Sequence, residues 1–336
     1  MVTIEQIAKR AGVSKTTVSY AFSGSKKISA ETREKILSIA DEMNYVPNRN
    51  AQLLRRERTF KIGLFLTGFS GSYFMYLVES INTTLDLLGY RLEIHFLRGN
   101  IHEKLCDIAG SNVDAAIIHD PFENEADLER LSAIMKERNI PMVTVGTEMA
   151  TSKASCVKMN GFKSFVDIVD YLFETGHRKI LFLGGKSSAD ERQRYKGFCE
   201  GMRKHKTPIF DTWDYIGDDP CEWVGYQVIR AKFPQLTEKP DAICCANDTL
   251  AIGCIKALQS FGYTVPNDIS VTGFDDLIPA KLFELDLTTM SNQVVRMGKI
   301  AAEEAVRLLK KGEKPKVIVT ESELIKGETI AVRKAL

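Results

Sequence analysis

The stretch that decides the fold of the N-terminal region is TIEQIAKRAGVSKTTVSYAFSG, residues 3–24. Thr3 and Gln6 have the spacing of a capping box, and the apolar residues that follow recur at helical intervals. Gly12 can adopt the left-handed conformation in which helices often end, and Ser14 is placed to cap a second helix. The pattern therefore predicts two short helices joined by a tight turn.

The second predicted helix has two dissimilar faces. Val18 and Phe22 fall on one side, whereas polar residues from Lys15 to Tyr20 share the other. A third amphipathic helix begins near Ser29 and completes a three-helix unit. Any small helical bundle has a solvated polar face, so periodicity alone does not assign a function. The Gly-containing turn between the first two helices favours a helix-turn-helix, whose second helix enters the major groove of DNA.

Three segments of this region closely resemble the headpiece of the LacI/GalR family of bacterial repressors: AKRAGVSKTTVSYAFSG (residues 8–24), ISAETREKI (28–36) and NYVPNRNAQLLR (44–55). The resemblance implies that residues 14–22 form the recognition helix. Many members carry Arg where Tyr20 stands, and a phenol cannot make the bidentate guanine contact of a guanidinium. The operator sequence therefore stays open. The expected DNA-contacting residues are Arg10, Lys15, Thr16, Thr17, Ser19, Tyr20, Asn48, Ala51, Leu54 and Arg55.

A basic stretch, NRNAQLLRRERTF (residues 48–60), separates this unit from the rest of the chain. A solvated linker is one interpretation, because an isolated helix shorter than about 12 residues is marginal in water. In the family, the corresponding segment is a hinge helix that forms over the centre of the operator. The resemblance places Leu54 where a leucine enters the minor groove, which kinks the duplex. Arg55 would lie beside it.

Charge is divided unevenly along the 336-residue chain, whose formal net charge is +1. Residues 1–60 contain 11 Lys/Arg and 6 Asp/Glu, which leaves 34 and 38 for the remainder. A basic end on an acidic body suits a small module that contacts phosphates. The seven cysteines are odd in number and lack metal-ligand spacing, so we expect reduced core thiols. The N-terminus lacks the apolar stretch of a signal peptide, so we expect a cytoplasmic protein without a membrane partner.

From residue 61 onward, short apolar runs alternate with stretches of helix length, which predicts parallel sheets covered on both faces. Two such series indicate two lobes, so the expected fold class is α/β, with a helix-turn-helix headpiece and a two-lobed doubly wound domain. The family resemblance extends here and implies the fold of periplasmic sugar-binding proteins. The predicted strands are KIGLFLT (61–67), RLEIHF (91–96), DAAIIH (114–119), PMVTVG (141–146), KILFLGG (179–185), DAICCA (241–246) and ISVTGF (269–274).

The resemblance also implies an effector pocket between the lobes. A polyol is held by a guanidinium, a carboxylate, an amide and an aromatic face. Several of these residue types also have a purely structural interpretation. Arg194 would then pair with a surface carboxylate, Asn247 and Asp248 would cap a helix, and Asp275 would cap a turn. The expected effector-binding residues are Ser70, Tyr73, Phe74, Asn160, Arg194, Asn247, Asp275 and Asn292.

The chain departs from the family pattern at several pocket positions. Gly146-Thr147 stands where many members have Asp-Arg, Met159-Asn160 stands where they have Val-Asp, and Asn292 replaces a common Gln. Charged contacts are thereby lost, so the resemblance does not name the ligand. We expect a sugar, a sugar derivative or another metabolite.

Other functional classes are disfavoured by the sequence. LGGKSS (183–188) resembles part of a P-loop, but a P-loop needs a glycine five residues before Gly185, and Ile180 stands there. The five histidines show no metal or catalytic spacing, and no Gly-x-Ser-x-Gly elbow is present. We therefore expect no enzyme activity and no cofactor. The alternatives to a sugar-controlled repressor are a regulator with a non-sugar corepressor, a transporter's solute-binding protein, and a doubly wound enzyme.

The expected organisation has a headpiece at 1–46, a hinge at 47–60 and an effector-binding and dimerisation domain at 61–336. Lobe 1 would comprise about 61–160 and 292–320, and lobe 2 about 161–291 and 321–336. The chain ends in GETIAVRKAL, which has no heptad repeat, so a homodimer is expected rather than a tetramer. The expected partners are a palindromic operator DNA and a small-molecule effector, a carbohydrate by the family resemblance.

Overall fold

The structure is a computed structural model that describes residues 2–22, 27–43, 45, 58–68, 71–119, 124–146, 151–186, 188–215, 221–277 and 286–333. The chain divides into two compact units, Met1–Thr59 and Phe60–Leu336. Each unit has its own hydrophobic core. The DNA-contacting candidates Asn48, Ala51, Leu54 and Arg55 and the effector candidate Ser70 lie outside the described residues.

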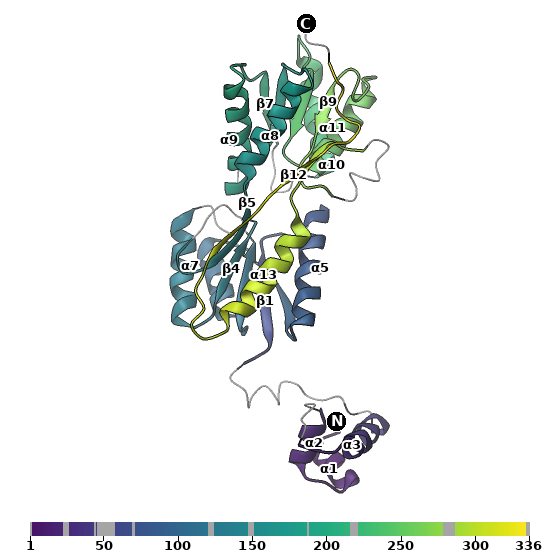
Figure 1. Cartoon of the computed structure of the whole chain (residues 1–336), viewed down its shortest axis with the longest axis vertical. Helices are drawn as coiled ribbons and strands as arrows, with labels where there is room; N and C mark the ends of the chain where they lie inside the picture. Colours follow the sequence, from purple (N-terminus) through teal and green to yellow (C-terminus); the bar gives the residue numbers. More distant parts are fainter. Residues whose placement is uncertain are drawn as a thin grey trace. The chain divides into compact units, whose positions relative to one another are not determined.

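The first unit is a bundle of short helices around a small apolar core. The helices are α1 (Ile4–Ala11), α2 (Lys15–Phe22) and α3 (Ala30–Glu42) (Figure 1). The buried residues recur at helical spacing on each helix, which is why three short segments can share one core. These residues are Ile7, Ala8, Ala11, Val18, Ala21, Ile36 and Ala40.

The second unit begins with a parallel sheet whose strand order is β11-β5-β4-β3-β1-β2. Its central strands β1, β3 and β4 are mostly apolar and buried, as expected of a sheet covered on both faces, whereas the edge strands β2 and β11 are partly exposed. This sheet and the helices on it are called lobe 1. The strands are β1 (Lys61–Leu66), β2 (Arg91–Phe96), β3 (Ala115–His119), β4 (Met142–Val145), β5 (Ser155–Met159) and β11 (Val317–Thr320).

Helices cover both faces of the lobe 1 sheet. Leu64 of β1 shares a core with Leu77 of α5, whereas its neighbour Phe65 shares a separate core with Ile108 of α6. Full burial of each such side chain contributes about 1.5–3 kcal/mol. α5 (Gly71–Leu87) and α13 (Val294–Leu308) lie side by side, and the other helices are α6 (Ile101–Gly110) and α7 (Glu125–Glu137) (Figure 1).

A second parallel sheet, with strand order β7-β6-β8-β9, forms the centre of lobe 2. Phe182 of β6 packs against Phe165 of α8 and Phe198 of α9, with ring centroids 6.0 and 5.1 Å apart. Lobe 2 contains β6 (Ile180–Gly184), β7 (Asp211–Asp214), β8 (Ala242–Cys245), β9 (Ser270–Thr272), α8 (Gly161–Glu174), α9 (Ala189–Lys204), α10 (Glu222–Lys232), the 3-10 helix η1 (Phe233–Gln235) and α11 (Asp248–Ser260).

The chain passes between the lobes from β5 into α8, from β10 into α13 and from β11 into β12. β10 (Thr289–Ser291) and β12 (Glu323–Ile325) form a small antiparallel pair. The predicted fold class is confirmed: a helical N-terminal unit precedes an α/β body with two parallel sheets. The apolar runs predicted the strands from β1 to β4 and β6, β8 and β9, whereas β5, β7, β10, β11 and β12 were not predicted.

All seven cysteines are free, as expected. Cys156, Cys244, Cys245 and Cys254 are buried. The expectation of core thiols is wrong for Cys106, which is exposed on α6, and holds only in part for the half-buried Cys199 and Cys221. The amphipathic pattern of α6 explains the first case, because its buried positions are Leu105, Ile108 and Ala109.

Candidate functional site

The turn between α1 and α2 has the geometry that the sequence predicts. The Thr3 backbone N–H donates to Gln6 Oε1 (2.8 Å), and the Gln6 N–H donates to Thr3 Oγ1 (3.3 Å), which completes the capping box. Gly12 ends α1 in the left-handed conformation, with φ +70°. The Thr17 N–H donates to Ser14 Oγ (3.1 Å) at the start of α2. A helix, a tight turn and a capped second helix are thus fixed by local contacts.

The polar side of α2 is on the surface of the unit. Lys15 and Thr16 are exposed, whereas Thr17, Ser19 and Tyr20 are half-buried. The Thr17 hydroxyl also lies 2.9 Å from the Ser14 hydroxyl, so part of its bonding capacity serves the helix start. The exposed hydroxyl of Thr16 is therefore better placed than that of Thr17 to reach an external partner.

The two basic candidates of the headpiece form exposed ion pairs. Arg10 Nη2 lies 2.7 Å from Glu42 Oε2, and Lys15 Nζ lies 2.7 Å from Glu5 Oε1. Exposed pairs of this kind are weak, so either cation can exchange its carboxylate for a phosphate at little cost. The Lys27 ammonium lies 5.3 Å from the centre of the Tyr20 ring.

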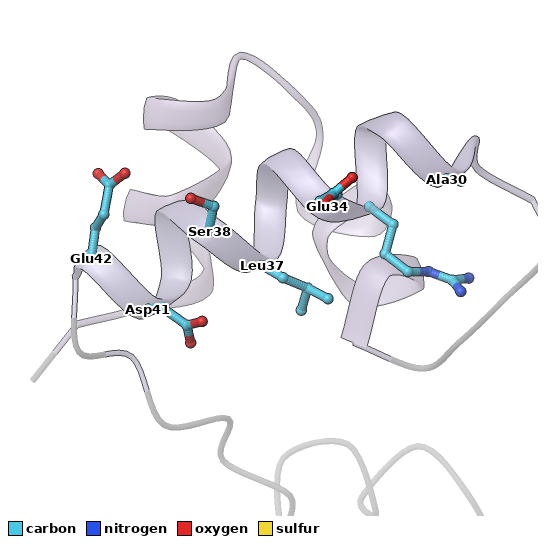
Figure 2. Close-up of a pocket in the computed structure, with 7 residues that line it drawn as sticks. Ala30, Glu34, Leu37, Ser38, Asp41 and Glu42 are labelled. Atoms are coloured by element: carbon cyan, nitrogen blue, oxygen red, sulfur yellow. The ribbon is translucent and has the colours of Figure 1, made fainter.

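The outer side of α3 has a different chemistry. Figure 2 shows a surface hollow along this helix, with the carboxylates of Glu34, Asp41 and Glu42 among the side chains that line it. Arg33 is the cation among the lining residues, against three carboxylates, and carboxylates repel the phosphates of DNA, so this hollow is poorly suited to a nucleic acid. Within the headpiece, the contrast favours α2 as the DNA-contacting helix.

In the second unit, the polar candidates gather where strands end. Asn160 follows β5, Asn247 follows β8 by two residues, and Asp275 follows β9 by three. Ligands bind at the carboxyl ends of the strands in doubly wound proteins. Both parallel sheets therefore direct candidate residues toward such an edge.

Arg194 lies on α9 and is held on several sides. Its Nη1 donates to the Ala246 carbonyl (2.8 Å), and its Nη2 pairs with Asp190 one turn earlier. The guanidinium lies 4.2 Å from the centre of the Phe274 ring. The predicted alternative of a carboxylate partner is therefore realised by Asp190, but the side chain is only 11% exposed, so this is not a surface pair.

Asp275 is joined to the segment that crosses between the lobes. Asn292 Nδ2 donates to Asp275 Oδ1 (2.7 Å), and the Asp275 N–H donates to the Met290 carbonyl (2.8 Å). Both polar side chains are buried, at 8% and 3% exposure. Asp275 also has φ +121°, a region that L residues rarely adopt and that is often found at functional sites.

Burial raises the pKa of Asp275 to about 7, and the nearby Arg194 opposes part of this rise. Asp248, which is fully buried, has its pKa raised to about 6, again mainly by burial. Its carboxylate accepts from the Leu277 N–H (2.8 Å) and from Thr289 Oγ1 (2.5 Å). Asp248 therefore fixes the loop that carries Asp275 and the strand that leads to Asn292.

The two other amide candidates serve as helix caps. Asn160 Oδ1 accepts from the Lys163 N–H (3.0 Å), and Asn247 Oδ1 accepts from the Leu250 N–H (2.8 Å). A chain neighbour of each lies against Arg194: Ala246, next to Asn247, accepts its hydrogen bond, and a Cβ on Gly161, next to Asn160, would lie 3.4 Å from Arg194 Cγ. The capping alternative for Asn247 is thus realised, although the position remains next to the guanidinium.

Lobe 1 contributes aromatic side chains. The rings of Tyr73 and Phe74 at the start of α5 lie 5.6 and 5.0 Å from the ring of His119 at the end of β3. Burial lowers the pKa of His119 to about 4, so the imidazole is neutral at physiological pH. The Tyr73 phenol is close enough to Arg194 to affect the pKa of that guanidinium. The structure therefore brings Tyr73 and Phe74 toward the lobe 2 cluster.

Sequence reasoning missed Asp190, His119 and Phe274. Asp190 and Arg194 have the i, i+4 spacing of a helical ion pair, which was a detectable signal. His119 is the last residue of a predicted strand, a position that the strand-end rule would have singled out. No local signal in the sequence indicates the contact of Phe274 with Arg194.

Among the residues that the structure describes, no group of three or more His, Cys, Asp or Glu side chains could hold a metal ion. Within the same part of the chain, no helix is long and apolar enough to cross a membrane.

Comparison with known families finds one match within each of the two units. A family described as "Bacterial regulatory proteins, lacI family" matches residues 3–48, and a "Periplasmic binding protein-like domain" matches residues 169–330. The chain is 30% identical over 320 residues to a probable HTH-type transcriptional repressor ExuR of Bacillus subtilis (strain 168), covering 93% of each protein. It is 30% identical over 336 residues to the HTH-type transcriptional repressor PurR of Vibrio parahaemolyticus, covering 98% of this chain and 99% of that protein.

Among solved structures, the Lac repressor dimer bound to operator and the anti-inducer ONPF matches with a TM-score of 0.86 at 24% identity. The match covers 98% of this chain and 99% of that one. A Lac repressor bound to ONPG in the repressed state matches with a TM-score of 0.87. These likenesses confirm the predicted fold.

The fold and the two polar sites define a helix-turn-helix protein with a periplasmic-binding-protein-like body. The chain belongs to the lacI family of bacterial regulatory proteins. It is a DNA-binding transcriptional regulator controlled by a small-molecule effector, and the predicted family resemblance is confirmed. The curated relatives are transcriptional repressors, which agrees with the expectation that the chain is not an enzyme.

Proposed function

We propose that the chain is a dimeric repressor that binds a palindromic operator through α2, and that a polyhydroxyl effector held by Arg194 and Asp275 switches this binding. One observation carries the effector site: Arg194 and Asp275, far apart in sequence, lie together at the strand ends of lobe 2, and Asn292, on the segment that enters lobe 1, is hydrogen-bonded to Asp275. Repression is the activity named for the curated relatives, and a dimer is named for a structural neighbour. A repressor of bacterial operators acts in the cytoplasm, where the chromosome lies.

The DNA contacts follow from the polarity of the headpiece. We assign Arg10 and Lys15 to phosphates, because they are exposed cations in weak ion pairs. Thr16 and Tyr20 on the polar side of α2 would contact base edges, with Thr17 and Ser19 beside them. Two headpieces with their hinges would neutralise on the order of 6 to 10 phosphates, which makes the affinity strongly dependent on salt.

The proposed boundaries are a headpiece at 1–46, a hinge at 47–60 and an effector-binding and dimerisation domain at 61–336. In the hinge, Leu54 would enter the minor groove, with Asn48, Ala51 and Arg55 against the DNA. Within the body, the proposed lobes are about 61–160 with 292–320, and about 161–291 with 321–336. These boundaries leave the basic residues of the chain's N-terminal part on the DNA side.

The effector would be held by groups from both lobes. Arg194 and Asp275 offer a donor and an acceptor, Asn160, Asn247 and Asn292 offer amides, and Tyr73 and Phe74 offer apolar ring faces. Ser70 completes the proposed set. A ligand can shift the DNA-binding equilibrium only by its difference in affinity for the two conformations, typically about 1–3 kcal/mol. Contacts to both lobes provide such a difference, because the ligand senses how the lobes are arranged.

The experiment that tests this function is selection of genomic DNA fragments by the full chain, followed by addition of candidate effectors. We expect one palindromic sequence to be enriched and then released or tightened by an effector. Thr16→Ala should weaken binding to that sequence by about 1–3 kcal/mol, because a base contact is lost. Ser38→Ala, which removes an exposed hydroxyl from α3, is the matched control and should bind as wild type does. Equal retention of all fragments would overturn the proposal.

A further inference from the structure

The strands of the lobe 1 sheet all run parallel, so their first residues share one edge of the sheet. We call it the entry edge, because the chain enters the body there. Phe60 immediately precedes β1, and its N–H donates to Asp114 Oδ2 (2.9 Å) just before β3. The crossings to lobe 2 from β5 and β11 leave from the opposite edge, where those strands end. The headpiece is therefore joined to the body at the edge of lobe 1 that is far from lobe 2.

A lysine-rich loop, residues 309–316 with the sequence LKKGEKPK, lies at the entry edge. It connects the end of α13 to the start of β11, and α13 runs toward this edge from the crossing that follows β10 (Figure 1). The loop contains four lysines and one acidic residue, whereas residues 61–336 as a whole contain 34 Lys/Arg and 38 Asp/Glu. Positive charge is thus concentrated at one place on a body whose net charge is negative.

The one acidic residue of the lysine-rich loop is bound by a cation of α13. The Arg307 guanidinium pairs with Glu313, donates to the Lys314 carbonyl (2.6 Å) and makes two hydrogen bonds to the Glu304 carboxylate (2.7 and 2.6 Å). Glu304 is only 3% exposed and also accepts from Ser155 Oγ (2.5 Å). Charge-assisted hydrogen bonds are strong where water is excluded, so these contacts hold the loop in place.

The lysines themselves are directed outward. Lys310, Lys311 and Lys314 are exposed, and none of them has an ion pair within the part of the chain that the structure describes. Lys316 Nζ lies 3.4 Å from Glu304 Oε2 and is therefore partly neutralised. Cations after a helix also interact favourably with the helix dipole, but this effect is limited to the last turn. It applies to the two lysines next to α13 and does not account for Lys314, which lies near β11.

From this charge distribution we infer that the lysine-rich loop is a second DNA-contacting surface, which binds backbone phosphates of the DNA that the headpiece holds. The inference rests on the operator binding of the proposed function and adds the body to it. Four strand spacings separate β11 from β1, or about 19 Å at about 4.8 Å each. One turn of duplex DNA is about 34 Å long. The loop therefore lies less than one duplex turn from the point where the DNA-binding unit is attached.

The contact is one of charge and reads no bases. The lysine ammonium is a point charge on a flexible stem, and phosphate contacts carry no direct sequence information. In a dimer each protomer supplies one loop, so the contact adds to the phosphates that the two headpieces and hinges neutralise. Each additional phosphate makes the log-log salt slope steeper by about 0.9. The loop therefore raises the affinity for all variants of the operator by the same factor.

The test compares three charge removals on the loop with three on lobe 2, each in the full chain. Affinity is measured over a range of salt concentrations for a duplex that carries the palindrome selected from genomic DNA. If each of two loops loses at least one phosphate, the slope should become shallower by about 2 or more. Lowering the salt concentration fourfold should then raise the affinity about tenfold less than in wild type. The loop variant combines Lys310→Gln, Lys311→Gln and Lys314→Gln, and the control combines Lys196→Gln, Lys206→Gln and Lys232→Gln, which are exposed in wild type.

A charge reversal provides the second measurement. Lys311→Glu should weaken operator binding more than Lys311→Gln does, and by the same factor for operators with altered bases, whereas Lys196→Glu should bind as wild type does. Circular dichroism should show that every variant is folded.

Two results overturn the inference: a loop variant with the salt slope of wild type, or a control whose slope changes as much as that of the loop variant. Either result leaves the proposed function standing if the protein still selects its operator. Failure of the wild-type chain to select any sequence contradicts the proposed function itself, and is seen before any variant is compared.

Discussion

The polar face of α2 and the Arg194–Asp275 cluster are both rich in hydrogen-bonding groups, but they place these groups differently. On α2, Lys15 and Thr16 are exposed, so their polarity has little cost in folding. In lobe 2, Asp275 and Asn292 are 8% and 3% exposed and satisfy one another. A surface face can change its sequence freely, whereas a buried cluster must keep its hydrogen bonds. The first suits variable base recognition, and the second suits a fixed ligand geometry.

The largest expected effect separates the two regions completely. Residues 60–336 alone should fold, dimerise and bind the effector, because this unit has its own core. Specific DNA binding should be lost, and specific sites are typically bound about 10³–10⁷-fold more tightly than non-specific DNA. Circular dichroism, sedimentation and a DNA titration check the three parts. Continued selection of the operator by this fragment would show that the headpiece assignment is wrong.

Loss of Arg194 should weaken effector binding by the Arg194–Asp275 cluster and leave operator binding by α2 unchanged. Arg194→Ala leaves Asp190 and Asp275 without their cation, and hydrogen bonds to charged groups are worth about 1.5–3 kcal/mol, or roughly 10–100-fold in effector affinity. Operator binding should be unchanged, but the effector should no longer alter it. Arg203→Ala, on the exposed part of the same helix, is the control. Calorimetry showing wild-type effector affinity in Arg194→Ala would remove this residue from the site.

A pH effect should belong to the buried cluster and be absent from the α2 face. Because burial raises the pKa of Asp275 from its ordinary 3.8 to about 7, its contribution to stability is present at acidic pH and is lost as the pH rises toward 7. In Asp275→Asn, the free energy of unfolding should therefore decline less over this range. Urea unfolding at several pH values measures the difference.

Asp268→Asn is the control for that measurement. Hydrogen bonds from Thr264 lower the pKa of Asp268, so this carboxylate contributes stability above its ordinary pKa and loses it as the pH falls. In Asp268→Asn, the free energy of unfolding should therefore still decline as the pH rises toward 7, as it does in wild type. If the free energy of unfolding of Asp275→Asn depended on pH as that of wild type does, the raised pKa of the buried Asp275 carboxylate would be contradicted.

The smallest expected effect concerns a single phosphate contact. Lys15→Ala should weaken operator binding about equally for all sequences and reduce the log-log salt slope by about 2, because both headpieces of the dimer lose one phosphate contact each. Because the Lys15–Glu5 pair is exposed, the variant should fold normally. Lys35→Ala on α3 changes the net charge by the same amount, and its salt slope should match that of wild type. An unchanged slope in Lys15→Ala would exclude the phosphate contact.

The headpiece was predictable because its determinants are local. The Thr3–Gln6 capping box, the left-handed Gly12 and the Ser14 cap each lie within four residues of the groups they serve. The central strands were also predictable, since long apolar runs such as residues 61–66 are typical of parallel strands. The segments β5, β7, β10 and β12 are short and mixed in polarity, and the apolar run of β11 is shorter still than that of β1. Their pairing depends on residues far away, as when Val317 of β11 aligns with Cys156 of β5.

The effector cluster was predictable only through the family resemblance. Nothing in the periodicity places residue 194 beside residue 275, because that contact depends on how α9 and the loop after β9 pack on one sheet. The same holds for Asn292, whose hydrogen bond to Asp275 spans 17 residues and a strand. Helical spacing would have paired Asp190 with Arg194, but not Arg194 with Phe274. These contacts depend on long-range packing, and they have no local pattern in the sequence from which they could be predicted.

The hydrogen bond from Asn292 to Asp275 has a consequence for how this regulator can evolve. Asp275 belongs to the proposed ligand site, whereas Asn292 belongs to the strand-to-helix segment that enters lobe 1. A substitution that adapts Asp275 to a new ligand must also alter that joint. Ligand choice and responsiveness are therefore linked, because a substitution of Asp275 also changes the contact that Asn292 makes.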